Sequence, residues 1–200
     1  MIKALIFDVG GVLLRTESLA GRQKWGDRLG LGLGEVDEAV FGCPEAAAAT
    51  LGEVDEAEVW AAVQRRFSLT VEQLAEFRHD FWSGDRLDEL ILDWVAARRG
   101  KYRTGILSNA WGGARKFLTS QAKLNAAFEI LVISAEEGLR KPNPVIYERT
   151  VQRLGVRASE AVFVDDVLQN VTAARQVGLE AIHFQKDINL PGEMARLGIE

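Results

Sequence analysis

An apolar segment near the start of the chain ends in an aspartate that is soon followed by two glycines. Residues 2–7 read Ile-Lys-Ala-Leu-Ile-Phe, and Asp8, Gly10 and Gly11 follow. A carboxylate at the end of a buried strand is unfavourable unless it binds a cation or takes part in chemistry. Two glycines allow a sharp turn and bring backbone amides close to an anion such as phosphate. The segment therefore predicts a catalytic strand end.

Three later segments are also apolar and also run into polar residues. They are residues 104–107 before Ser108 and Asn109, residues 129–133 leading towards Lys141, and residues 161–164 before Asp165 and Asp166. Because the strands of a parallel sheet end along one edge, their polar residues are expected to face a common crevice. Asp8 would then meet a hydroxyl, a lysine and an acid pair.

The rest of the chain divides into a helical block and a regular alternation of strands and helices. From about residue 16 to residue 83 the apolar residues recur at helical spacing, and no segment has a clear strand pattern. From residue 85 strands and helices alternate to the end, which is typical of a parallel sheet covered on both faces. We expect an α/β fold with a Rossmann-like core, residues 1–14 and 84–200, and a helical insertion, residues 15–83.

In this order the motifs resemble those of the haloacid dehalogenase-like hydrolase superfamily. Its members carry a nucleophilic Asp, a Ser or Thr, a Lys and an acidic pair. The Phe-Asp-x-Gly motif at residues 7–10 and Val-Asp-Asp at 164–166 are similar to those of small bacterial members that include sugar-phosphate phosphatases. The resemblance implies that the insertion is a cap over the active site. It also implies a magnesium-dependent phosphatase acting on a small phosphorylated metabolite through an aspartyl-phosphate.

The resemblance assigns roles to residues of the four motifs. Asp8 is expected to be the nucleophile, and Lys141 to neutralise both Asp8 and the transferring phosphoryl group. Two adjacent acids without a counter-charge predict a hard cation, and oxygen ligands favour Mg²⁺. The expected metal ligands are Asp8, the Gly10 carbonyl, Asp166 and, through water or as an outer partner, Asp165; the expected phosphate or substrate contacts are Gly11, Ser108, Asn109 and Trp111.

Gly10 departs from the usual pattern of the superfamily. Most of its phosphatases place a second Asp two residues after the nucleophile, where it protonates the leaving group. General acid catalysis contributes roughly 10²- to 10⁴-fold. Turnover is therefore expected to be slow, to depend on a good leaving group, or to be supported by water or a cap residue.

Three alternatives stay open at the level of sequence. A 2-haloacid dehalogenase would use Asp8 on carbon without a metal, but such enzymes carry an aromatic residue at the position of Gly10. Phosphonate cleavage needs a cap lysine, and Lys24 is the single lysine between residues 14 and 84. A protein that binds a phosphorylated ligand with lost or weak turnover is the non-enzyme alternative, and it rests on Gly10.

Composition excludes several classes of partner. The formal charge of −5 disfavours a nucleic-acid surface. Cys43 is the single cysteine, so no intrachain disulfide is possible. The apolar run at the amino terminus is too short for a signal peptide or a membrane span. We expect a cytoplasmic protein without a membrane partner, and the sequence sets no oligomeric state.

Overall fold

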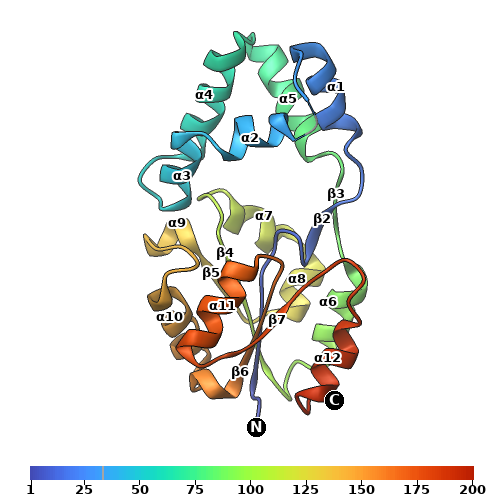
Figure 1. Ribbon diagram of the computed structural model, residues 1–200, viewed down its shortest axis with the longest axis vertical. Coiled ribbons are helices and arrows are strands. Elements are labelled where there is room, and N and C mark those ends of the chain that lie inside the picture. The colour runs from blue at the N-terminus through green and yellow to red at the C-terminus, as the bar shows by residue number, and fades with distance from the viewer. Residues whose placement is uncertain (33) are drawn as a thin grey trace.

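The sheet at the centre of the molecule has five parallel strands. The computed structural model describes residues 1–32 and 34–200. The strand order is β5-β4-β1-β6-β7, and each neighbouring pair runs parallel. The predicted parallel sheet is therefore confirmed (Figure 1). The strand bounds are Ala4–Phe7 for β1, Arg103–Ser108 for β4, Ile130–Ile133 for β5, Ala161–Asp165 for β6 and Glu180–His183 for β7.

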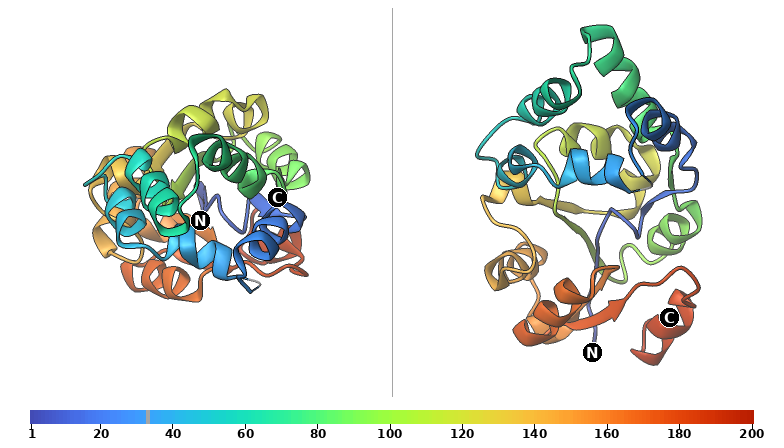
Figure 2. Two further views of the ribbon diagram at one scale, coloured as in Figure 1. Left: turned by 90° about the horizontal axis from the view of Figure 1, so that it is seen from above. Right: turned by 45° about the horizontal axis from the view of Figure 1, so that its top comes forward.

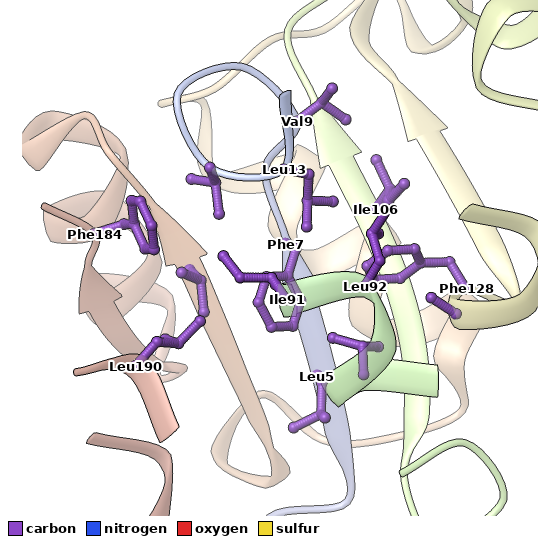
Figure 3. Close-up of a cluster of buried hydrophobic side chains, with 14 of the residues drawn as sticks. Leu5, Phe7, Val9, Leu13, Ile91, Leu92, Ile106, Phe128, Phe184 and Leu190 are labelled. Atoms are coloured by element: carbon purple, nitrogen blue, oxygen red, sulfur yellow. The ribbon is translucent and has the colours of Figure 1, made fainter. Parts of the chain in front are cut away.

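Helices cover both faces of this sheet because the side chains of β1 alternate between two apolar clusters. Leu5 and Phe7 belong to one cluster, and Ala4 and Ile6 belong to the other. Figure 3 shows the first cluster, with Phe7 packed among side chains of several elements. The first face is covered by α6 (Glu89–Ala96), α7 (Ala114–Ser120), α8 (Ala122–Ala127) and α12 (Leu190–Arg196), and the second by α10 (Pro144–Leu154) and α11 (Leu168–Val177).

Within the described residues, five helices lie between β2 and β3. They form a separate layer above the carboxyl edge of the sheet (Figures 1 and 2). They bury an apolar cluster of their own, which includes Trp25, Trp60 and Phe77. The last of them begins at a capping box in which Thr70 and Gln73 bond reciprocally, so its start is encoded locally. This layer is the helical cap. Its helices are α1 (Ala20–Leu29), α2 (Glu35–Phe41), α3 (Pro44–Thr50), α4 (Glu56–Phe67) and α5 (Val71–Trp82).

Two short antiparallel strands connect the cap to the core. Strand β2 (Leu14–Thr16) pairs with β3 (Asp85–Leu87). No local sequence signal indicates either strand, because their pairing joins segments about seventy residues apart. The expected boundary between residues 14 and 15 falls within β2, and the one between residues 83 and 84 falls just before β3. Both boundaries stay predictions. The remaining short elements are α9 (Ser134–Glu137) and a 3₁₀ turn at Ala158–Glu160. Within the described residues, no helix has the length and apolarity needed to cross a membrane.

Candidate active site

Asp8 lies immediately after β1, at the start of a tight turn. Its backbone N–H donates to Val164 O at 2.9 Å, which continues the pairing with β6. Its Oδ1 accepts the N–H of Val9 at 2.7 Å. The carbonyl of Val9 then accepts the N–H groups of Leu13 and Leu14 at 2.9 and 2.8 Å, which folds the glycine turn back on itself. The turn holds a largely buried carboxylate, 8% exposed, at the edge of the sheet.

Lys141 is a buried cation shared by two carboxylates. Its Nζ lies 2.9 Å from Asp8 Oδ2 and 2.7 Å from Asp165 Oδ2. A third bond goes to the carbonyl of Leu107 at 3.1 Å, so all three ammonium donors have partners. The predicted meeting of Asp8, Lys141 and the acid pair is therefore present in the structure.

Asn109 holds the main chain of Lys141. Its Oδ1 accepts the N–H of Lys141 at 2.8 Å, and its Nδ2 donates to the Lys141 carbonyl at 3.0 Å. Because both ends of the amide are engaged with the main chain, Asn109 positions the lysine, a role that no local pattern indicates. Its contact with phosphate stays a prediction. The same holds for Ser108, which ends β4 and is buried at the same edge.

The two acids of the pair have different surroundings. Asp165 is fully buried, and its Oδ1 accepts the N–H of Val167 at 2.8 Å. The amide of Asn170, on α11, donates to both Asp165 oxygens at 3.1 Å, and the Tyr147 hydroxyl donates to the Asn170 carbonyl at 3.0 Å. Asn170 thus orients the acid loop. Asp166 lines a cleft between the core and the cap, together with Gly10 and Gly11.

Three carboxylates are close enough to share a cation. Asp8, Asp165 and Asp166 each offer an oxygen, and these oxygens lie within 4.8 Å of one another. Burial raises the pKa of Asp8 to about 6, although Lys141 opposes the rise. Burial and the neighbouring Asp165 also raise the pKa of Asp166. Lys141 alone does not offset three acids, so this donor set fits a hard divalent cation such as Mg²⁺.

The two glycines of the turn have different steric surroundings. Gly11 has a φ of +72°, and a Cβ there would lie 2.0 Å from Asp166 Oδ2. The N–H of Gly11 donates to Leu14 O at 3.0 Å. The amide of Gly11 is therefore engaged within the turn, and its contact with phosphate stays a prediction. Because Gly11 has no side chain, Asp166 can lie close to the backbone at this position. A Cβ at Gly10 would meet nothing within 4 Å.

We expect Gly11→Ala to disturb the acid cluster and Gly10→Ala to leave it intact. The Gly11 variant combines a left-handed backbone with a clash against Asp166 and should lose about 1–3 kcal/mol of stability. It should also lose most of the thermal stabilisation that Mg²⁺ gives the wild type. Thermal unfolding with and without Mg²⁺ measures both effects, and Gly10→Ala is the matched control. Equal behaviour of the two variants would contradict the assignment.

Trp111 connects the core to the cap. Its indole N–H donates to the carbonyl of Ala46 on α3 at 3.2 Å. Its ring lies 5.9 Å from that of Trp60 and 5.7 Å from that of Phe41. The ring is buried in the apolar cluster of the cap, and it is not among the residues that line the cleft. Cap packing thus covers the ring of Trp111, and its contact with substrate stays a prediction.

A large cleft of about 1360 Å³ lies beside the acid cluster. Its core side includes Gly10, Gly11 and Asp166, and its cap side includes Phe41 and Trp82. Sequence reasoning missed both aromatic residues. Phe41 and Trp82 each end a cap helix, and only the packing of the cap brings these helix ends to the cleft.

Comparisons with known proteins identify a matching family and several similar proteins. The sequence profile described as haloacid dehalogenase-like hydrolase matches residues 2–178. D-ribitol-5-phosphate phosphatase of Bacteroides thetaiotaomicron is 26% identical over 193 residues, which cover 90% of each protein. A sesquiterpene phosphatase of Aspergillus oryzae is 37% identical over 70 residues, and this match covers 35% of the chain and 36% of that protein.

A solved structure gives the same fold. It is a variant of a haloacid dehalogenase family enzyme from Bacteroides thetaiotaomicron, in complex with magnesium and inorganic phosphate. The TM-score is 0.79 at 20% identity, with 96% of this chain and 99% of that chain covered. The sheet and the helical cap are thus shared between the two proteins.

Proposed function

Since this chain belongs to the haloacid dehalogenase-like hydrolase family, we propose that it is a magnesium-dependent phosphatase acting on a small phosphorylated metabolite. The observation that carries the proposal is the contact of one buried lysine, Lys141, with Asp8 and Asp165 beside a third acid, Asp166. The phosphatase relatives support the same class of reaction. Sugar phosphates are one candidate class of substrate, because D-ribitol-5-phosphate phosphatase is among those relatives.

In the first step, a carboxylate oxygen of Asp8 attacks phosphorus and the bond from phosphorus to the ester oxygen breaks. This forms an aspartyl-phosphate and releases an alkoxide or phenoxide. Lys141 remains against Asp8 and offsets part of the negative charge. Asp8, Asp165 and Asp166 would hold Mg²⁺, which supplies charge neutralisation for the phosphoryl group when bound. The Gly10 carbonyl is a further proposed ligand.

In the second step, water attacks phosphorus of the aspartyl-phosphate and the bond to the Asp8 oxygen breaks. Inorganic phosphate leaves and the Asp8 carboxylate is regenerated. The proton released by water matches the one taken up by the leaving group in the first step, so the net reaction is hydrolysis. Asn109 maintains Lys141 in place through both steps by its two bonds to the lysine backbone.

A second candidate, carbon–halogen cleavage, would use Asp8 without a metal. The three clustered carboxylates favour the phosphatase instead, because they disfavour one another unless a cation is bound. Phosphonate cleavage through Lys24 is disfavoured as well. The Lys24 ammonium contacts Glu76 and Asp80, each at 2.7 Å, and Lys24 is not among the residues lining the cleft.

Phosphate release from a panel of phosphorylated metabolites, with Mg²⁺ and with EDTA, tests the proposal. Release that requires Mg²⁺ and disappears with EDTA is the expected result. A haloacid panel assayed for halide release in EDTA is the control for the dehalogenase. Tight binding of a phosphorylated compound without any product would instead favour the ligand-binding alternative that rests on Gly10.

We expect the rate of the wild type to depend steeply on the pKa of the leaving group, because Gly10 supplies no acid. Gly10→Asp should flatten this dependence and raise the rate on primary alkyl phosphates by about tenfold or more. A Cβ at Gly10 would meet nothing within 4 Å, so the first atom of the new side chain has room. Rates on a series of aryl and alkyl phosphates measure the slope, and Gly10→Asn is the control without an acid. A flat slope in the wild type would mean that another group supplies the proton.

A further inference from the structure

Two aromatic side chains of the cap are exposed at the wall of the cleft. Phe41 ends α2 and Trp82 ends α5, and they are 49% and 39% exposed. Their ring centroids lie 5.9 Å apart. The same cleft is lined on the core side by Gly10, Gly11 and Asp166. Paired exposed rings at a cleft are typical of a recognition surface.

Two cationic side chains of the cleft, Arg15 and Arg22, offer little to a second anionic group. Arg15 is paired with Asp88, and Arg22 is paired with Asp37 and Asp85. Both guanidinium groups are therefore already neutralised by carboxylates. The other charged residues of the lining are Glu17, Asp166, Lys186 and Asp187. With Asp166 assigned to the cation, Glu17 and Asp187 still outnumber Lys186 in this lining. The cleft therefore suits a substrate whose single phosphate is carried by an otherwise uncharged group.

The absence of an acid at Gly10 also restricts which substrates react readily. Gly10 provides no acid to protonate the leaving group, so the bond to phosphorus breaks more easily when a phenoxide departs than when an alkoxide departs. The aryl ring of such a substrate is also planar and apolar, which matches the exposed rings of Phe41 and Trp82. The missing acid at Gly10 and the exposed rings of Phe41 and Trp82 are independent observations. Both favour an aromatic leaving group.

We propose that the substrate is an aryl phosphate whose ring packs on Phe41 and Trp82 while its single phosphate faces Asp8. This inference rests on the proposed phosphatase function and narrows its substrate class. The net reaction is aryl phosphate plus water giving a phenol and inorganic phosphate. The cleft volume of about 1360 Å³ accommodates a ring system larger than a single phenyl group.

Steady-state kinetics with Mg²⁺ on 1-naphthyl phosphate, phenyl phosphate and acetyl phosphate tests the proposal. Naphthol and phenol are similar leaving groups, so a difference in KM between them reports ring contact. Acetyl phosphate has a good leaving group without a ring. In the wild type, the KM should be lowest for 1-naphthyl phosphate and highest for acetyl phosphate. A KM for 1-naphthyl phosphate equal to or above that for phenyl phosphate would overturn the proposal.

Substitutions of the two rings locate the contact. Phe41→Ala and Trp82→Ala should each raise the KM for 1-naphthyl phosphate about fivefold or more, with less than about a twofold change for acetyl phosphate. Phe117→Ala is the matched control, because Phe117 is 44% exposed on α7 and is not part of the lining. That control should leave both values unchanged.

The outcomes separate this inference from the proposed function. If the enzyme hydrolyses all three compounds but Phe41→Ala and Trp82→Ala change the three KM values equally or not at all, the aryl-phosphate proposal is wrong and the phosphatase stands. If no compound of this set or of the metabolite panel releases phosphate with Mg²⁺, the phosphatase function itself is wrong.

Discussion

Asp8→Asn should abolish turnover and leave the fold intact. The amide has nearly the same shape as the carboxylate but does not attack phosphorus, so the rate should fall by at least about a thousandfold. Stability should change by only about 1 kcal/mol. Burial already disfavours the charged form of Asp8, as its pKa of about 6 indicates, and a neutral amide avoids that cost.

Phosphate release and thermal unfolding of the same Asp8→Asn preparation check this prediction. Mass spectrometry after incubation with substrate adds a direct readout, because the wild type should carry a transient phosphoryl group that the variant lacks. Retention of wild-type activity by a folded Asp8→Asn protein would show that the proposed nucleophile is wrong.

Lys141→Met should damage both stability and activity. The substitution removes the ammonium that lies 2.9 Å from Asp8 and 2.7 Å from Asp165, and it leaves two buried carboxylates without their counter-charge. Loss of one partner from a buried ion pair costs about 3–5 kcal/mol. The rate should fall by about 10²- to 10³-fold, because the lysine is also proposed to offset charge on the transferring phosphoryl group.

The neighbouring Arg140 provides the matched control for Lys141. Arg140 is exposed, so Arg140→Met should change stability by less than about 0.5 kcal/mol and leave the rate nearly unchanged. Urea unfolding and phosphate release on both variants make the comparison. Similar losses in the two variants would mean that the contacts of Lys141 with Asp8 and Asp165 contribute little.

The sheet and its catalytic edge were predictable from local pattern. An apolar run of four to six residues that ends in Asp8, Ser108 or Asp165 indicates a buried strand followed by a polar loop, and a strand lies at each of these places. Because parallel strands end along one edge, the same pattern predicts that Asp8, Lys141 and the acid pair meet, as they do. Gly178 ends α11 in a left-handed conformation, which glycine adopts readily at the end of a helix.

The partners of individual side chains were not predictable in this way. Asn109 and Lys141 are 32 residues apart, and nothing local indicates that an amide after a core strand holds a lysine backbone. The same holds for Trp111, whose position after β4 suggested the cleft, whereas Ala46 and Trp60 of the cap cover it. The steric difference between Gly10 and Gly11 also depends on Asp166, which is distant in the sequence.

The sequence by itself determined the order of the strands and helices of the central sheet and the residues that end its strands. The spacing of apolar residues and the glycines and polar residues that end each element are local properties. The tertiary structure decided which of those residues face the cleft and which hold one another in place. It also decided the position of Phe41 and Trp82 on the cleft wall, because the packing of five cap helices and the pairing of β2 with β3 set where helix ends lie. Contacts between distant segments depend on the summed geometry of the fold, and no short stretch of sequence encodes them.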